Sequence, residues 1–425
     1  MKKSNYNIFL KLDDIDSNKY ALYNIMYRKY LILNYKEKLD IENILKDLDK
    51  SNFSSDEISY LKNLAQIGAI VPNEYNEINH LKVLYNQNKF NNTFCMLLNP
   101  TLDCNFRCSY CYENHRNEYY DSDMINRIIK LVENKSNEFK RIEIGWFGGE
   151  PLLAIDNIKY LSKEFKSICK KNNCSYEAKM TTNGYLLNDE IISNLANLNI
   201  NSLQITLDGT KKYHDKKRHL ENGTGTYEKV KNNCIKILEN KIKITLRTNI
   251  DKENYNDILN LFTEIPYEYR KNVLFQASNL FDNNETINFY LIYKKAIDYG
   301  YRFYDTGNMP VKCEGATFNS VTIYPNNKLS FCSIAAENNK FFGYLSDDGI
   351  IKFNNKELYY TFKNIEPFES NNCTKCVELP MCMGSCVFKK FSDKNICTKI
   401  KGLSLVDTIK LHIYNNMKGL KNNAE

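Results

Sequence analysis

Three cysteines, Cys104, Cys108 and Cys111, stand in one short segment with the spacing CxxxCxxC. A loop with three thiolates can hold a 4Fe-4S cluster and leave one iron without a protein ligand, whereas clusters built for electron transfer take four cysteines. A structural zinc site is the alternative, but zinc sites favour paired CxxC knuckles with four ligands, and His115 is the one nearby candidate for a fourth. We therefore expect an iron-sulfur cluster whose open iron binds a small molecule.

Further polar motifs follow the cysteine loop along the chain: Gly148-Gly149-Glu150-Pro151, Thr181-Thr182-Asn183-Gly184, Thr206-Leu207-Asp208-Gly209 and the run from His214 to Arg218. Glycines allow close backbone approach, and Glu150 offers an acceptor to an ammonium group. The guanidinium of Arg218 is suited to bidentate binding of a carboxylate. Each motif alone is as readily a turn or a strand cap, but their order along successive strands favours a common site.

A second group of cysteines lies near the end of the sequence, with a CxxC pair followed by a CxxxC pair. Its members are Cys313, Cys332, Cys373, Cys376, Cys382, Cys386 and Cys397. On chemical grounds this pattern could hold zinc or iron-sulfur clusters. The four other cysteines, Cys95, Cys169, Cys174 and Cys234, are expected to be small core residues, because free cysteine is among the most buried residue types.

Length and composition limit the class of protein. A chain of 425 residues, 43% of them hydrophobic, predicts two or three domains. The formal charge of +7 is spread without a long basic run, so we expect no nucleic-acid partner. We find no secretory signal and no apolar membrane span, which predicts a cytoplasmic protein without a membrane partner. In that reducing compartment, 14 cysteines favour metal ligation over disulfides.

Residues 93–305 alternate between strand and helix patterns. We expect strands at 94–98, 142–147, 178–181, 203–207, 242–247 and 273–276, with helices such as 125–139, 152–169 and 227–238 between them. Six βα units in sequence predict an α/β fold with a parallel sheet, curved or closed into part of a barrel. Active sites in that architecture lie at the carboxyl ends of the strands, and the cysteine loop directly follows the first strand.

The flanking segments have different patterns. Short strands at 6–12, 20–25, 30–34 and 69–71, with helices at 41–48, 56–67 and 76–85, predict a small α+β unit, and the polar residues 86–92 predict a linker. Residues 311–399 lose regular periodicity, so we expect a loop-rich region held by metal clusters. Residues 403–417 predict an amphipathic helix. The expected domains are therefore 1–90, 91–306, 307–400 and 401–425.

With Tyr110 in its aromatic position, the CxxxCxYC motif resembles the signature of radical S-adenosylmethionine (SAM) enzymes. The resemblance implies a partial (βα)6 TIM-type barrel in which the glycine-rich edge binds the methionyl amine and Arg218 binds the methionyl carboxylate. Thr206 stands where the family usually has serine, and it keeps the hydroxyl. The implied SAM-binding residues are Tyr110, Gly148, Gly149, Glu150, Thr182, Asn183, Thr206, Asp208 and Arg218.

The second cysteine group resembles the SPASM extension of this family, which carries auxiliary 4Fe-4S clusters. The resemblance implies three clusters in all, one of the auxiliary two held by Cys373, Cys376, Cys382 and Cys397. The other would be held by Cys313, Cys332 and Cys386, with a distant residue or a substrate thiolate as its fourth ligand. Asn327 stands where the SPASM pattern usually has glycine, and asparagine tolerates the left-handed turn expected there.

The amino-terminal unit resembles the winged-helix-like, PqqD-like leader-binding domain of peptide maturases, with a dimerisation or structural cap as the alternative. Together these resemblances imply oxidative modification of a ribosomally made peptide, such as a thioether or other side-chain cross-link, through a 5'-deoxyadenosyl radical. The implied partners are a precursor peptide with a leader and a low-potential electron donor such as flavodoxin or ferredoxin. Two alternatives are an anaerobic sulfatase maturase, although Ser333 stands where those enzymes have aspartate, and a zinc-stapled binding protein.

Overall fold

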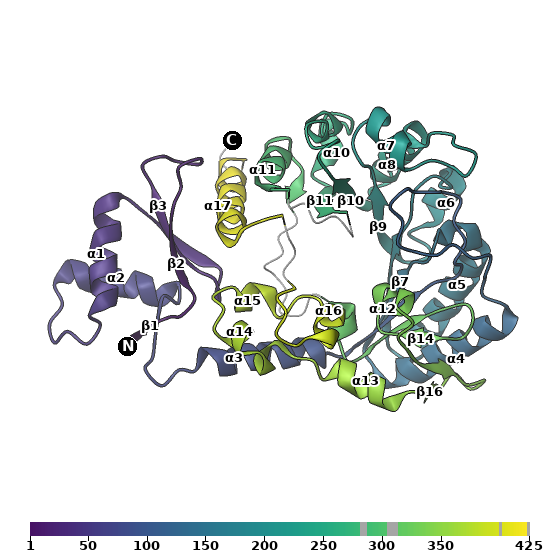
Figure 1. Cartoon of the computed structure of the whole chain (residues 1–425), viewed down its shortest axis with the longest axis horizontal. Coiled ribbons are helices and arrows are strands. Elements are labelled where there is room, and N and C mark those ends of the chain that lie inside the picture. Colours follow the sequence, from purple (N-terminus) through teal and green to yellow (C-terminus); the bar gives the residue numbers. More distant parts are fainter. Residues whose placement is uncertain (281–286, 304–312, 399–401, 423–425) are drawn as a thin grey trace. The chain divides into compact units, whose positions relative to one another are not determined.

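The computed structural model describes residues 1–280, 287–303, 313–398 and 402–422 (Figure 1). These residues fall into two compact units. Unit 1 holds residues 1–89, Cys313 and the described residues from Ile365 onward, and unit 2 holds the described parts of 90–304 and 314–364. The domain boundaries expected at 90, 306 and 400 stay predictions.

Unit 2 is built on a sheet of 11 strands among the described residues, in the order β12-β11-β10-β9-β8-β7-β6-β13-β14-β15-β16. The six strands β6 to β11 are parallel and each overlaps one predicted strand, which confirms the parallel sheet. They are β6 (Thr93–Leu98), β7 (Arg141–Trp146), β8 (Ser175–Thr181), β9 (Ile200–Thr206), β10 (Lys243–Ile250) and β11 (Val273–Asn279). Two more parallel strands flank them, β12 (Arg302–Phe303) and β13 (Ser320–Ile323).

Helices cover one face of this sheet, and Figure 1 shows them outside the strands of unit 2. The longer ones are α4 (Ser122–Glu138), α5 (Ile155–Lys171) with the short η1 (Pro151–Ala154) before it, α8 (Tyr227–Glu239) and α11 (Tyr290–Asp298). The shorter ones are α6 (Asp189–Asn194), α7 (Lys211–Lys217), α9 (Ile258–Leu261) and α10 (Tyr267–Arg270). Buried side chains such as Trp146, stacked on Phe165 at 6.4 Å between ring centroids, form the core between helices and sheet.

The opposite face of the sheet carries polar side chains that are at least partly exposed, because residues alternate sides along each strand. We call it the polar face, and it includes Glu143, Lys179, Gln204, Arg247 and Gln276. The sheet therefore has an apolar face, which the helices cover, and a polar face. At the carboxyl ends of the strands the polar face is next to the loops that follow them.

The sheet continues where the sequence predicts a loop-rich region. Three antiparallel strands, β14 (Leu329–Ser330), β15 (Phe341–Leu345) and β16 (Ile351–Phe353), extend it beyond β13, and α12 (Ser333–Glu337) and α13 (Lys356–Lys363) belong to the same segment. Asn327 adopts the expected left-handed conformation, with φ of 57°. Its side chain makes two 2.9 Å hydrogen bonds to the backbone of Leu345, which fixes the turn.

Unit 1 contains the predicted α+β segment. Strands β2 (Asn7–Lys11), β3 (Tyr20–Asn24) and β4 (Lys29–Leu33) form an antiparallel sheet, and β1 (Lys2–Lys3) pairs with β5 (Ile70–Val71). Helices α1 (Tyr35–Lys46) and α2 (Ser55–Gln66) both begin at capping boxes, in which side chain and backbone at the first turn satisfy each other.

Helix α3 (Glu77–Lys89) extends into the segment that the sequence predicts as a linker. The buried Lys89 ammonium pairs with the Glu366 carboxylate at 2.5 Å, which stabilises the end of the helix. The prediction of a linker at 86–92 is therefore wrong for residues 86–89, which belong to α3.

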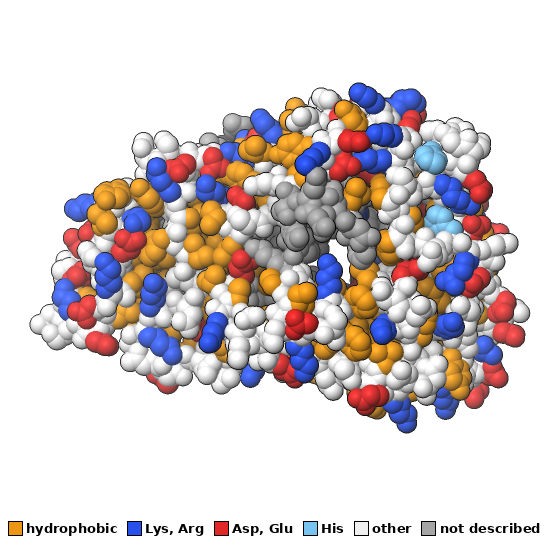
Figure 2. Space-filling view, in the orientation of Figure 1, with side chains coloured by type: hydrophobic (Ala, Val, Ile, Leu, Met, Phe, Trp, Pro, Cys, Tyr) orange, Lys and Arg blue, Asp and Glu red, His pale blue; other side chains and the backbone are white. Residues whose placement is uncertain are grey.

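The rest of unit 1 is made of short helices and one long helix. The short ones are η3 (Pro367–Glu369), α14 (Asn371–Thr374), α15 (Leu379–Cys382) and α16 (Val387–Ser392). The predicted carboxyl-terminal helix is confirmed as α17 (Leu405–Asn422), and Lys410 pairs with Asp14 at 2.7 Å. None of the described helices is long and apolar enough to span a membrane. Figure 2 shows acidic and basic side chains interspersed on the face in view.

Candidate active site

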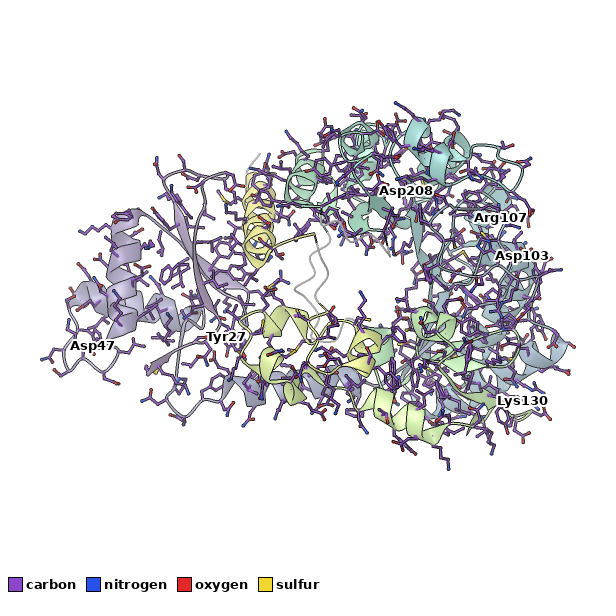
Figure 3. The ribbon with its side chains drawn as sticks, in the orientation of Figure 1. Tyr27, Asp47, Asp103, Arg107, Lys130 and Asp208 are labelled. Carbon is purple, nitrogen blue, oxygen red and sulfur yellow. The ribbon has the colours of Figure 1, made fainter. Side chains whose placement is uncertain are left out.

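The cysteine loop follows β6 and is held by backbone hydrogen bonds to a distant segment. The Arg107 N–H donates to His219 O at 2.9 Å, and the Ser109 N–H donates to Lys217 O at 3.1 Å. The loop is thus fixed against the end of α7 and the residues that follow it. Figure 3 labels Asp103 and Arg107, which come from this loop.

The three thiols of this loop lie near one another. Burial raises the pKa of Cys104 to about 12, and the thiols of Cys108 and Cys111 add to that rise. The imidazole Nε2 of His115 lies 3.5 Å from Cys111 Sγ. Among the residues that the structure describes, no three His, Cys, Asp or Glu side chains converge in the geometry of a single-ion site. Three neighbouring thiols fit the donor set of an iron-sulfur cluster, because thiolates are the ligands these clusters use.

The glycines after β7 pack against the cysteine loop. Gly148 has φ of +103°, and a Cβ there would lie 2.2 Å from Thr101 O. A Cβ on Gly149 would lie 2.2 Å from Asp103 O. The Glu150 N–H donates to Asp103 O at 2.8 Å. Glycine is therefore required at both positions for the two loops to approach.

Glu150 connects the loops after β7 and β8. Its side chain is fully buried and accepts hydrogen bonds from Thr182 Oγ1 at 2.6 Å, Asn183 N at 2.7 Å and Leu152 N at 3.1 Å. Burial raises the pKa of Glu150, while these hydrogen bonds oppose the rise. The Asn183 Nδ2 donates to Asn105 Oδ1 at 2.8 Å, in the cysteine loop. The structure thus brings three predicted site residues together.

Tyr110 is the centre of a second polar cluster, which we call the Tyr110 cluster and which also contains Asp208, Arg218 and Asn249. The Tyr110 hydroxyl donates to the Asp208 carboxylate and accepts from Arg218 Nη1 at 2.9 Å and Asn249 Nδ2 at 3.1 Å. Asp208 is fully buried and also accepts from the Asn249 N–H at 2.8 Å. Figure 3 labels Asp208, which follows β9. The cluster therefore ties the cysteine loop to the ends of β9 and β10.

Arg218 lies buried in this cluster, with its guanidinium 5.6 Å from the Phe106 ring centroid. Burial disfavours its charge, but Tyr110, Cys108 and Asp208 raise the pKa of Arg218 above its ordinary value. Its Nε is buried and has no hydrogen-bond partner among the described residues. An unsatisfied buried donor of this kind fits a carboxylate ligand.

Three more residues lie at this edge of the sheet, and the SAM-binding role predicted for one of them, Thr206, stays a prediction. Thr206 ends β9 but makes no described side-chain hydrogen bond to the Tyr110 cluster. Asn249 has no role predicted from sequence, and its place near the carboxyl end of β10 is the one signal that could have identified it. His214 accepts from the Asp208 N–H at 3.3 Å, and its other ring nitrogen lies 3.1 Å from Thr226 Oγ1. Because burial lowers the pKa of His214 well below its ordinary value, it is a neutral positioning residue.

The carboxyl-terminal cysteines divide between the units. In unit 1, burial raises the pKa of Cys382, and the thiols of Cys373, Cys397 and Cys376 add to the rise, so these three lie near Cys382. Cys313 and Cys386 also belong to unit 1, whereas Cys332 belongs to unit 2 and caps the start of α12. The grouping of Cys313, Cys332 and Cys386 stays a prediction. Of the cysteines expected in the core, Cys169, Cys174 and Cys234 are buried, and Cys95 is half-buried.

These features define an α/β protein whose thiol, carboxylate and guanidinium groups converge at the carboxyl edge of a parallel sheet. Residues 98–265 match the family model of the radical SAM superfamily, so the chain contains a radical SAM domain. The resemblance to that family drawn from the cysteine motif is confirmed.

Two curated relatives illustrate the range of activities in the family. The chain is 32% identical over 180 residues to a GTP 3',8-cyclase of Clostridium perfringens (strain 13 / Type A), covering 39% of this chain and 51% of that protein. It is 30% identical over 175 residues to a cysteine-type anaerobic sulfatase-maturating enzyme of Clostridium novyi (strain NT), covering 38% of this chain and 45% of that protein. The matches thus span about half of the length of these relatives.

Solved structures share the fold over more of the chain. The structure of anSMEcpe with bound AdoMet and Kp18Cys peptide aligns with a TM-score of 0.57 at 17% identity, covering 78% of this chain and 99% of that one. The structure of Streptococcus suis SuiB bound to precursor peptide SuiA aligns with a TM-score of 0.52 at 14% identity, covering 93% of this chain and 97% of that one. At these identities the likeness concerns the fold.

Proposed function

We propose that this protein is a radical SAM enzyme that oxidatively modifies a ribosomally made precursor peptide, forming a thioether or another side-chain cross-link. The observation that carries the proposal is the convergence of the three-cysteine loop, buried Glu150 and buried Arg218 at one edge of the sheet. Each of these groups is hydrogen-bonded to, or packed against, the loop that holds the thiols. The site is therefore arranged for a metal centre and a ligand that carries both an ammonium and a carboxylate.

The roles follow from the contacts. Cys104, Cys108 and Cys111 would hold the cluster, Glu150 would accept from the methionyl ammonium, and the unpartnered Nε of Arg218 would donate to the methionyl carboxylate. When bound, the cluster would supply the electron that cleaves SAM into methionine and a 5'-deoxyadenosyl radical. Tyr110 holds the Arg218 guanidinium in place, and the buried surroundings limit the access of water.

A peptide substrate is supported by the amino-terminal sheet and by the fold likeness. In the described residues, β2 and β4 are the outer strands of their three-stranded sheet, so each offers an edge to which an extended leader could add. SuiB, whose solved structure holds precursor peptide SuiA, is similar in fold over 93% of this chain. The four neighbouring thiols around Cys382 would hold one auxiliary cluster, which would accept the electron that the substrate radical loses when the cross-link forms.

A sulfatase-maturase function is the second candidate, and the 30% identity to the Clostridium novyi enzyme favours it. Against it stands Ser333, which follows Cys332 where those enzymes have aspartate. The Tyr112 hydroxyl lies 3.2 Å from Ser333 Oγ, so a hydroxyl pair occupies this position. Activity on a cysteine-containing sulfatase peptide, with formylglycine as product, would support this second function.

The test uses the full chain, reconstituted anaerobically with iron and sulfide. With SAM and dithionite we expect 5'-deoxyadenosine from the wild type and none from Cys108→Ala. Peptides encoded by short reading frames beside the gene are then added, and mass spectrometry should reveal a loss of two hydrogens per cross-link. Iron-loaded wild type that forms no 5'-deoxyadenosine contradicts the radical chemistry. Turnover of the sulfatase peptide alone contradicts the cross-linking function.

A further inference from the structure

Arg247 stands on the polar face of the sheet, close to the candidate active site. Strand β10 places it opposite Thr206 of β9 and Gln276 of β11. Its neighbours along the strand, Leu246 and Thr248, are buried on the opposite, helix-covered face. The guanidinium therefore belongs to the face that leads up to the site.

The described partners of Arg247 are neutral. Its Nη2 donates to Ser278 Oγ at 3.1 Å and its Nε donates to Asn249 Oδ1 at 3.3 Å. No carboxylate among the residues that the structure describes forms an ion pair with it. Within the described ranges, this half-buried guanidinium is held by a hydroxyl and an amide, and it keeps donors and charge for an anion.

Other charged residues, on β7 and β8 of the same face, form ion pairs. Lys179 pairs with Glu143 at 3.2 Å and with Glu314 at 2.8 Å, and Arg141 lies 3.5 Å from Glu177. Those pairs involve β7 and β8, away from β10. Arg247 differs from them because it combines a position near the site with neutral described partners.

Hydrogen bonds link Arg247 to the Tyr110 cluster. Asn249, which accepts from Arg247, donates through its amide nitrogen to Tyr110 Oη at 3.1 Å. Burial raises the pKa of Tyr112, and the guanidinium of Arg247 opposes that rise, so the two side chains are near one another. Arg247 thus lies on the polar face and is linked through Asn249 to Tyr110 of the cysteine loop, so a substrate on this face near the loop would be within reach of the guanidinium.

We propose that Arg247 binds a carboxylate of the peptide substrate and so selects a substrate with an acidic group near the modified residue. This inference rests on the proposed peptide-modifying function. The geometry of a guanidinium suits two parallel hydrogen bonds to a carboxylate. Arg218, with its unpartnered Nε, is assigned to the carboxylate of SAM, so the ligand of Arg247 is a second carboxylate. An aspartate or glutamate side chain and a peptide carboxyl terminus are its two sources.

The test compares the peptides that wild type and variants select. Libraries of random 15-residue peptides, one displayed with a blocked carboxyl terminus and one with a free terminus, are panned on immobilised, cluster-loaded full chain with SAM present. We expect wild type to enrich Asp or Glu about tenfold or more at one position, as a charge-assisted hydrogen bond would give. Enrichment in the free-terminus library alone would identify the terminal carboxylate as the source.

Variants at the same position separate this role from a structural one. Arg247→Gln should lose the acidic preference, Arg247→Lys should retain part of it, and Arg247→Glu should select Lys or Arg instead. Lys243→Gln is the matched control, because Lys243 is exposed at the amino end of the same strand and should leave the preference unchanged. If Arg247→Gln is too unstable to use, the Arg247→Lys and Arg247→Glu pools decide the question.

Two kinds of result would overturn the inference. One comes from the selection: a wild type that prefers neither Asp or Glu nor a free carboxyl terminus, or the same preference in the Arg247→Glu pool. The other is a tenfold loss of SAM affinity in Arg247→Gln, measured by equilibrium dialysis, which would assign the guanidinium to SAM. Formation of 5'-deoxyadenosine without peptide is measured in parallel. If wild type forms no 5'-deoxyadenosine, the proposed radical function is refuted. The peptide selection tests the role of Arg247 separately, because it measures binding and needs no turnover.

Discussion

Replacing Glu150 by glutamine changes one oxygen of a fully buried carboxylate to an NH2 group. One carboxylate oxygen accepts from Thr182 Oγ1 at 2.6 Å and Leu152 N at 3.1 Å, and the other accepts from Asn183 N at 2.7 Å. In either amide orientation the new NH2 group faces a donor. An unsatisfied buried donor costs about 1–3 kcal/mol, so we expect the free energy of unfolding to fall by that amount.

The same change should weaken SAM binding. A hydrogen bond between an ammonium and a carboxylate contributes about 1.5–3 kcal/mol, which corresponds to a Kd about 10- to 150-fold higher in Glu150→Gln. Equilibrium dialysis of SAM against anaerobic, cluster-loaded protein measures the Kd, and urea unfolding measures the stability. Both measurements are needed because a loss of stability could by itself raise the Kd for SAM.

Glu143→Gln is the matched control, since Glu143 lies on β7 and its partly exposed carboxylate pairs with Lys179 at 3.2 Å. An exposed ion pair contributes about 0–1 kcal/mol, so this variant should keep nearly full stability and an unchanged Kd for SAM. A Glu150→Gln variant that binds SAM as tightly as Glu143→Gln would refute the assignment of Glu150 to the methionyl ammonium.

Three further predictions concern the Tyr110 cluster, the second cysteine group and an ion pair beside the site. Tyr110→Phe removes a hydroxyl with three polar partners, so stability should fall by about 1–3 kcal/mol in urea unfolding, and 5'-deoxyadenosine formation should fall with it. Cys382→Ala should lower the iron content by about one cluster and reduce stability, whereas the buried control Cys234→Ala should keep its iron. Burial alone would raise the pKa of Asp251, but the ion pair with Lys217 and the hydrogen bond from the Asn254 N–H hold it below 3.8. The Asp251 carboxylate therefore binds a proton less tightly in the folded state than in the unfolded state. The free energy of unfolding should therefore fall as the pH drops below 3.8. This fall should be less steep in Asp251→Asn than in the exposed control Glu253→Gln, and thermal unfolding at several pH values measures it.

Much of the sheet in unit 2 follows from local sequence. Segments such as 142–147 and 203–207 are apolar runs bounded by helical periodicity, and each overlaps a strand of the parallel sheet. Because the carboxyl ends of parallel strands meet at one edge, the order of the motifs also predicts that Glu150, Asp208 and Arg218 approach the cysteine loop. The hydrogen bonds of these residues agree with that expectation.

Other features depend on contacts that the sequence does not reveal. Strands β14 to β16 have two to five residues each, too few for a period, and they form because they pair with one another beside β13. Helix α3 extends past its predicted end because Lys89 finds an acidic partner far away in the sequence. The roles of Asn249 and Arg247 depend on strand register, since register decides which side chains of β9, β10 and β11 become neighbours.

The two polar clusters position the cysteine loop from different strands. Glu150 joins it to the loops after β7 and β8 through the Asp103 carbonyl and the Asn183 amide, while Tyr110 joins it to Arg218. The groups that would bind the ammonium and the carboxylate of SAM are thus the same groups that hold the thiol loop in place. Glu150→Gln and Tyr110→Phe should therefore combine non-additively in a double-mutant cycle of SAM affinity, because each alters the position of the loop on which both depend. Additive losses would show that the two clusters act on SAM independently of the loop.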